Sequence, residues 1–219
     1  MPTTIIFDYM GIIADPDYLK LIWDMPLPNK YAALRIFVGM KKHPEIKEAF
    51  RQYQKGTIDR NGLHDVAAEF YPKSAHVVNE LLDKLPSYVT VNNKVIELAR
   101  SLRESGIRTF IMSNAIPETE ETMKGLNLDG AFEGIILSNK IGAKKPSRKI
   151  FTYAFETYGI DPGQTVLIDD TKKNLRAAEA LGITPLHCKN STETCEELTT
   201  LFSDILSTRV VESEVEVLK

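Results

Sequence analysis

Aspartates follow two apolar stretches of this chain, and a carboxylate placed in that way can act as a nucleophile or bind a metal ion. Residues 4–7 lead into Asp8, and residues 165–168 lead into Asp169 and Asp170. Both stretches are short and β-branched, as in strands that are covered on both faces. A carboxylate at the end of a buried strand is costly unless it meets a cation or hydrogen-bond donors. The three aspartates are therefore predicted to share a site with positive charge.

A hydroxyl and a lysine complete the set of candidate groups. Ser113 follows a third apolar stretch, residues 109–112, and Lys145 precedes Pro146 at the expected start of a helix. The carboxyl ends of parallel strands lie at one edge of a sheet, so the aspartates and Ser113 are expected to converge there. Each group alone has an ordinary structural explanation: a helix cap for Ser113, a surface position for Lys145, and a turn for the aspartate pair.

Taken together, these groups suit the transfer of a phosphoryl or alkyl group. Asp8 would be the nucleophile, and a hard cation such as Mg²⁺ would keep the crowded carboxylates ionised. Ser113 would donate a hydrogen bond to the transferring group. Lys145 would neutralise Asp8 and the developing negative charge.

The order of elements predicts an α/β fold with a doubly wound parallel sheet of the Rossmann type. Amphipathic helices alternate with the strands, and each of the clearest three is followed by a glycine that can end a helix. Strands are expected at 4–7, 108–112, 134–137, 165–168 and 184–187, and these helices at 93–105, 147–158 and 171–181.

One long section interrupts this alternation. Residues 15–89 contain no convincing buried strand and are expected to form helices at 17–23, 30–38, 44–55, 59–70 and 74–82. We predict a helical cap domain over 15–89 and an α/β core domain over 1–14 and 90–219. An insertion directly after the first strand lies at the edge where open α/β sheets bind ligands. The cap is therefore placed to cover the site and exclude water.

The ordered motifs resemble those of the haloacid dehalogenase superfamily, whose helical cap matches the inserted helices. The resemblance covers residues 4 to 187 and rests on four blocks, FDYMGII, TFIMSN, KKP and VLIDD, the last continued by TKKNLRAAEALGI. It implies a covalent aspartyl intermediate, usually in the Mg²⁺-dependent hydrolysis of a phosphate ester.

By matching positions, the resemblance implies a role for each candidate residue. Asp8 would be the nucleophile, Ser113 the phosphate-binding hydroxyl and Lys145 the motif lysine that directly precedes the proline. Asn114 would add a phosphate contact. The metal ligands would be Asp8, the backbone carbonyl of Met10, Asp169 and, partly through water, Asp170.

One position departs from the phosphatases of this superfamily. They carry a second aspartate two residues after the nucleophile, where this chain has Met10. The missing carboxylate normally protonates the leaving alcohol and later activates water, which is worth roughly 10²–10⁴-fold in rate. The hydrolysis of alkyl phosphates should therefore suffer most, and that of acyl or aryl phosphates, which have good leaving groups, least.

Met10 leaves other functions open. The 2-haloacid dehalogenases have an aromatic residue there and need no metal, and Arg35 would be the halide-binding arginine of the cap. The phosphonate hydrolases have alanine, retain Mg²⁺ and use a cap lysine, which the sequence does not single out. A third alternative is a protein that keeps the fold and the metal site but acts by binding a ligand or partner. The pair Asp169 and Asp170 favours the metal-dependent phosphatase over the dehalogenase.

The composition argues against several other classes of protein. The 219 residues include 27 basic and 30 acidic side chains, without the basic stripe and interleaved aromatics of a nucleic-acid surface. We expect no signal peptide, and no apolar stretch reaches the roughly 18 residues that span a bilayer. Cys188 and Cys195 are expected to be reduced thiols.

We expect a cytoplasmic enzyme, a monomer or homodimer, that acts on a small phosphorylated substrate without nucleic-acid or membrane partners. The tail 210–219 alternates valine with polar residues, as in a half-exposed strand or a loose end.

Overall fold

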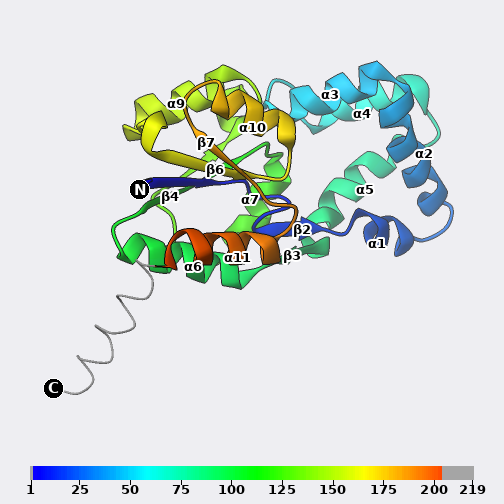
Figure 1. The fold of residues 1–219 in the computed structure, drawn as a ribbon. Helices are drawn as coiled ribbons and strands as arrows, with labels where there is room; N and C mark the ends of the chain where they lie inside the picture. Colours follow the sequence, from blue (N-terminus) through cyan, green and yellow to red (C-terminus); the bar gives the residue numbers. More distant parts are fainter. Residues whose placement is uncertain (1, 204–219) are drawn as a thin grey trace.

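A five-stranded parallel sheet forms the centre of the protein (Figure 1). The computed structural model describes residues 2–203, so the tail 210–219 lies outside the described residues. The strand order is β5-β4-β1-β6-β7, which confirms the predicted doubly wound α/β fold. The strands are β1 (Thr4–Phe7), β4 (Arg108–Ser113), β5 (Gly134–Leu137), β6 (Thr165–Asp169) and β7 (Thr184–His187).

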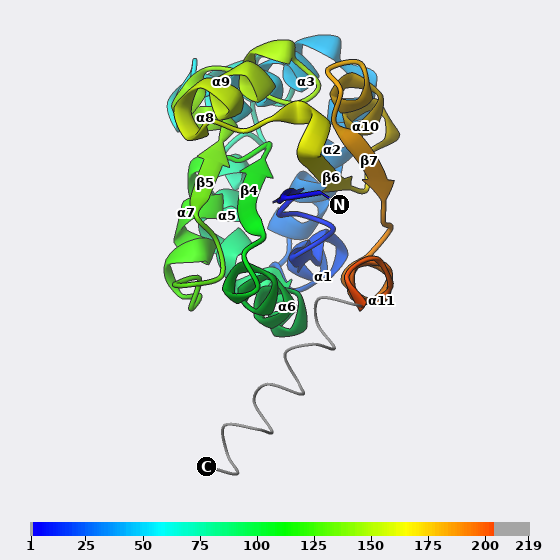
Figure 2. The same ribbon diagram turned by 60° about the vertical axis from the view of Figure 1, so that its left-hand side comes forward.

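Helices cover both faces of the sheet, because successive side chains of each buried strand point to opposite faces. In β1, Ile5 and Phe7 pack into one apolar cluster and Ile6 into the other. The first cluster includes side chains of α6 (Asn93–Glu104), α7 (Pro117–Lys124) and α11 (Ser191–Leu201). The second includes side chains of α9 (Arg148–Tyr158) and α10 (Lys172–Glu179). Figure 2 shows α9 and α10 on the opposite side of the sheet from α6 and α11.

The inserted section forms a helical cap with an apolar core of its own, beside the sheet (Figure 1). Leu21, Ala33, Tyr53 and Leu82 are among its buried side chains. Its helices are α1 (Tyr18–Trp23), α2 (Asn29–Lys42), α3 (Pro44–Gln54), α4 (Arg60–Phe70) and α5 (Val77–Lys84), followed by the 3₁₀ turn η1 (Leu85–Tyr88). No helix within the described residues is both long and apolar enough to cross a membrane.

Several short elements were absent from the sequence prediction. Two antiparallel strands, β2 (Ala14–Pro16) and β3 (Val89–Val91), pair where the chain enters and leaves the cap. They have three residues each, too few for an alternating pattern to be recognised. The helix α8 (Ser138–Ile141) has four residues and the turn η2 (Pro162–Gln164) has three, and α7 is mostly polar.

Candidate active site

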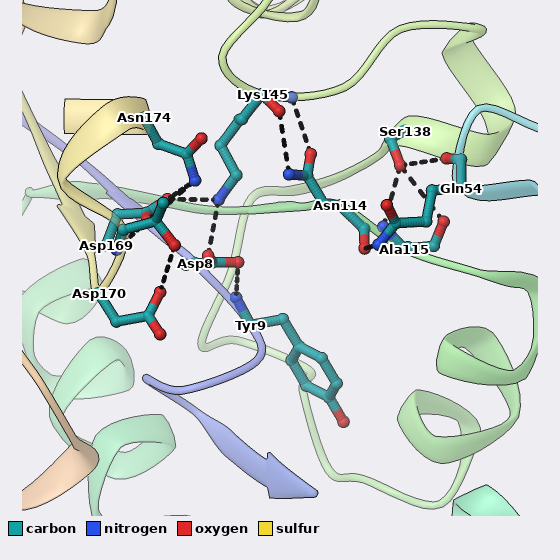
Figure 3. Close-up of polar contacts among 11 residues, drawn as sticks. Asp8, Tyr9, Gln54, Asn114, Ala115, Ser138, Lys145, Asp169, Asp170 and Asn174 are labelled. Carbon is teal, nitrogen blue, oxygen red and sulfur yellow. Dashed lines mark hydrogen bonds and ion pairs between the residues drawn. The ribbon is translucent and has the colours of Figure 1, made fainter. Parts of the chain in front are cut away.

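Side chains from two strand ends and one loop meet in a buried cluster at the carboxyl edge of the sheet (Figure 3). Lys145 Nζ lies 2.9 Å from Asp8 Oδ2 and 2.7 Å from Asp169 Oδ2. Phe7 of β1 pairs with Ile168 of β6, so the two aspartates follow neighbouring strands at the same height. All three side chains are buried. The sheet register therefore brings together groups that are far apart in the sequence.

Asp170 completes a group of three carboxylates with Asp8 and Asp169. One oxygen from each lies within 4.8 Å of the others. Gly11 has a φ of +87°, and a Cβ at this position would lie 2.8 Å from Asp170 Oδ2. Glycine therefore allows the loop after β1 to approach this carboxylate. Oxygen ligands at this spacing fit a hard divalent cation such as Mg²⁺.

The ionisation of the cluster supports the same conclusion. Burial raises the pKa of Asp8 to about 7; Lys145 opposes this shift, and Asp169 adds to it. Burial also disfavours the charged form of Lys145, but the two carboxylates outweigh it and raise the pKa of Lys145 above its ordinary value. One ammonium group therefore does not offset the negative charge of the three carboxylates. A bound divalent cation would supply the missing positive charge.

Asn174 is a member of the cluster that the sequence analysis missed. Its Nδ2 donates to both carboxylate oxygens of Asp169 at 3.0 Å. The backbone N–H of Thr171 also donates to Asp169 Oδ1, at 2.8 Å. Asn174 lies in the first turn of α10, which begins directly after the strand end. Its spacing of five residues from Asp169 was the only available signal, because asparagine on a helix is usually a surface residue.

Ser113, at the end of β4, carries a buried hydroxyl without a partner. The residue is 1% exposed, and its Oγ has no hydrogen-bond partner among the described residues. A buried hydroxyl without a partner is costly. Its position beside the end of β1 fits a group that hydrogen-bonds a ligand next to Asp8.

The side-chain amide of Asn114, which was predicted to contact phosphate, forms hydrogen bonds with the backbone of Lys145. Its Nδ2 donates to the carbonyl of Lys145 at 3.1 Å, and its Oδ1 accepts from the backbone N–H of Lys145 at 2.7 Å. These two bonds hold the lysine loop against the end of β4. Asn114 therefore positions Lys145 in this structure.

Met10 and Arg35, the two other predicted site residues, make no polar side-chain contact with the carboxylate cluster within the described residues. Met10 is half-buried, and its side chain packs against the apolar core, where it supplies no proton donor. Arg35 is exposed on α2, with its guanidinium 5.5 Å from the centre of the Tyr71 ring. Within the described residues it has no hydrogen bond or ion pair with the cluster. The Met10 side chain thus packs against the core and Arg35 lies on the cap, while metal binding by the Met10 carbonyl stays a prediction.

Cap and core are joined by polar contacts close to the cluster. The Tyr53 hydroxyl of α3 lies 2.8 Å from one carboxylate oxygen of Glu118 and 2.9 Å from the other. Arg60 Nη2 of α4 donates to the same carboxylate at 2.7 Å, and Glu118 on α7 is 5% exposed. Gln54 Nε2 donates to the Asn114 carbonyl at 3.3 Å (Figure 3). These contacts place α3 directly beside the lysine loop.

A doubly wound α/β core with aspartates at its strand ends and a helical insertion after its first strand defines a class of hydrolases. The family model described as haloacid dehalogenase-like hydrolase matches residues 3–182. The chain belongs to this family, as the resemblance of its motifs indicated.

Individual relatives are distant. The sesquiterpene phosphatase astK of Aspergillus oryzae is 21% identical over 69% of this chain and 78% of its own length. A D-ribitol-5-phosphate phosphatase of Bacteroides thetaiotaomicron is 20% identical over 93% of this chain and 100% of its own length. Three other relatives are much longer proteins, of which the matched segment spans 23% to 29%. The phosphatase names agree with a hydrolase of the phosphatase type.

A solved structure shares the fold. It is a HAD family enzyme from Bacteroides thetaiotaomicron in complex with magnesium and inorganic phosphate. It superimposes with a TM-score of 0.66 at 23% identity, covering 86% of this chain and 95% of that chain.

Proposed function

We propose that this hydrolase cleaves phosphate monoesters of small molecules in a Mg²⁺-dependent reaction in which Asp8 receives the phosphoryl group. The contact of Lys145 with both Asp8 and Asp169 carries the proposal, because it joins a buried nucleophile to a metal-binding carboxylate. Phosphatase names among the relatives, and the magnesium and phosphate in the solved neighbour, support it. A cytoplasmic location and a monomeric or homodimeric state stay predictions.

The chain's own residues account for the first half of the reaction. A carboxylate oxygen of Asp8 attacks phosphorus, and the bond from phosphorus to the alcohol oxygen breaks, which leaves an aspartyl phosphate and an alkoxide or phenoxide. Ser113 donates a hydrogen bond to the transferring group. Lys145 stays at the nucleophile, where its charge offsets the developing negative charge. Bound at the three carboxylates, Mg²⁺ would neutralise phosphate charge and orient the ester.

The second half regenerates Asp8. Water attacks the aspartyl phosphate, and inorganic phosphate leaves with the added oxygen, so the carboxylate returns unchanged. The side chain of Met10 can neither protonate the leaving alcohol nor accept a proton from water. Esters with good leaving groups therefore turn over fastest, because they depart without protonation.

The test measures phosphate release from 4-nitrophenyl phosphate. Activity should require Mg²⁺ and disappear with EDTA. Asp8→Asn should lower kcat by about 10⁴–10⁶-fold, the range seen when one member of a catalytic triad is removed in another hydrolase. The matched control is Asp65→Asn, on the exposed side of α4, which should retain activity.

Three outcomes would contradict the proposal. Unchanged turnover in Asp8→Asn would show that Asp8 is not the nucleophile. Chloride release from 2-chloropropionate without metal would favour the dehalogenase. Saturable binding of a phosphate ester without any turnover would favour a protein that acts by binding.

A further inference from the structure

A cavity of about 580 Å³ lies beside the carboxylate cluster and carries the opposite charge. It is lined by α3 of the cap, by the loop at 142–147 and by the first turns of α9 and α10. Glu48 is the only acidic residue of this lining. The basic residues are Arg51, Lys55, Lys144, Lys145, Lys149 and Lys173. We call this hollow the basic pocket.

Most of this positive charge is not neutralised by the protein. Arg51 is paired with Glu48 at 3.2 Å. Lys55, Lys149 and Lys173 form no ion pair within the described residues. Like charges held together raise the free energy of the folded protein. An anion that binds among the cations lowers this free energy, because it offsets their mutual repulsion.

Lys144 shows most directly that positive charge is disfavoured in the basic pocket. It is half-buried, and its ammonium group donates to the neutral amide oxygen of Gln54. Burial, followed by the charges of Arg51 and Lys55, lowers the pKa of Lys144 to about 8. The side chain is thus held where its positive charge is disfavoured in the absence of an anion.

Two helix N-termini add to the positive potential. Ser147 is the N-cap of α9, and Thr171 is the N-cap of α10. Both residues line the basic pocket. Backbone N–H groups and the helix dipole favour anions at such positions.

The basic pocket adjoins the reacting groups through Lys145. The same residue lines the pocket and places its Nζ 2.9 Å from Asp8 Oδ2. Asn114 also lines the pocket and holds the backbone of Lys145. Lys145 and Asn174, which both contact Asp169, therefore place the basic pocket next to the carboxylate cluster.

We propose that the basic pocket binds a second anionic group of the substrate, so that the enzyme acts on phosphate monoesters that carry a further phosphate or carboxylate. This inference rests on the proposed function of Asp8. The shared chemistry is an oxyanion, which lysine and arginine bind through charge-assisted hydrogen bonds. An oxyanion would accept from Lys144 and from the exposed lysines at the rim.

The first experiment uses matched pairs of aryl phosphates. Each carries, on a tether of increasing length, either a carboxylate or the neutral carboxamide of the same shape. For at least one tether length, kcat/KM should favour the carboxylate by about tenfold or more. The preference should fall as ionic strength rises. Equal values for both members at every length would overturn the proposal.

Variants locate the effect. In Arg51→Gln and Lys173→Gln, the ratio of the two kcat/KM values should fall towards one. In the control, Lys124→Gln, the ratio should stay as in the wild type, because Lys124 is paired with Glu121 away from the pocket. A ratio that is unchanged in both pocket variants would overturn the assignment to this pocket.

A binding measurement separates this inference from the proposed function. Calorimetry on Asp8→Asn compares the dissociation constants of the same two compounds with and without the pocket substitutions. Tighter binding of the carboxylate, lost in the pocket variants, supports the basic pocket even if no ester is turned over. Sulfate that binds in the pocket and changes phenyl phosphate turnover, with no carboxylate preference, would make the pocket an effector site and overturn the claim about substrate.

Discussion

Two neighbouring regions of this protein carry unbalanced charge of opposite sign. At the strand ends, the ammonium group of Lys145 contacts the carboxylates of Asp8 and Asp169, and an oxygen of Asp170 lies within 4.8 Å of both carboxylates. In the basic pocket, cations outnumber the one carboxylate of Glu48. Lys145 belongs to both linings. Each imbalance identifies a different ligand: a cation for the first region and an anion for the second.

A third charged group shows what a balanced site looks like. The buried carboxylate of Glu118 accepts from Arg60 and from the Tyr53 hydroxyl. It joins cap to core, and its charge is offset by the protein alone. A buried charge that is fully paired indicates a structural role, whereas buried charge left over indicates a ligand.

The largest expected gain in activity comes from adding a fourth carboxylate to the first region. Met10→Asp restores a proton donor and acceptor two residues after Asp8. Hydrolysis of alkyl phosphates should rise by about 10²–10⁴-fold, and hydrolysis of 4-nitrophenyl phosphate by less. Steady-state kinetics on both esters measure the difference. An unchanged rate on alkyl phosphates would mean that residue 10 does not face the leaving group.

Binding of Mg²⁺ should stabilise the folded protein, because the cation offsets the negative charge of the three carboxylates. Mg²⁺ at 100 times its dissociation constant should raise the free energy of unfolding by about 2.7 kcal/mol. For a chain of this size, that corresponds to roughly 5–10 °C in Tm. Thermal denaturation with Mg²⁺ and with EDTA measures the shift.

Asp169→Asn is the matched control for the metal effect, since it removes a charge but keeps the shape of the side chain. Its Mg²⁺-dependent shift should be much smaller. An equal shift in the variant would place the cation elsewhere and break the contrast between the two regions.

The smallest expected effect is a change in folding stability on removing one cation from the basic pocket. Lys144→Gln removes a cation whose folded pKa is about 8 against an ordinary value of 10.5. Between these pH values the unfolded chain binds a proton that the folded chain has lost, so wild-type stability rises with pH across this window. The variant should be more stable below pH 8 by up to about 1 kcal/mol, since solvent screens part of the charge. The difference should disappear above pH 10.5.

Denaturant unfolding of both proteins at several pH values measures this difference. A variant that is less stable than the wild type at neutral pH would show that Lys144 is already compensated within the protein.

The sequence predicted the strand-end region well. Each aspartate followed a recognisable apolar strand, and the carboxyl ends of parallel strands meet at one edge of the sheet. Asn174 escaped notice because its contact with Asp169 depends on how α10 turns back over the strand end. The bonds between the Asn114 amide and the Lys145 backbone were not indicated by the sequence, and the contact of Asn114 with phosphate stays a prediction.

The sequence predicted much less of the region near the cap. The cap helices were found at nearly their observed positions from their apolar spacing. The contacts of Tyr53 and Arg60 with Glu118 were not, since nothing in a helical pattern specifies which core residue a cap residue meets. The basic pocket draws on α3, the 142–147 loop, α9 and α10, so no local cluster in the sequence revealed it.

By itself the sequence determined the α/β core, the helical insertion and the convergence of the acidic groups. Hydrophobic periodicity is a local signal that identifies strands and helices, and parallel strand geometry then places the strand ends at one edge of the sheet. Only the tertiary structure decided how the cap is held to the core, which groups surround Lys145, and where positive charge accumulates. Those features depend on side chains from distant segments meeting in space, and their spacing in the sequence does not encode that meeting.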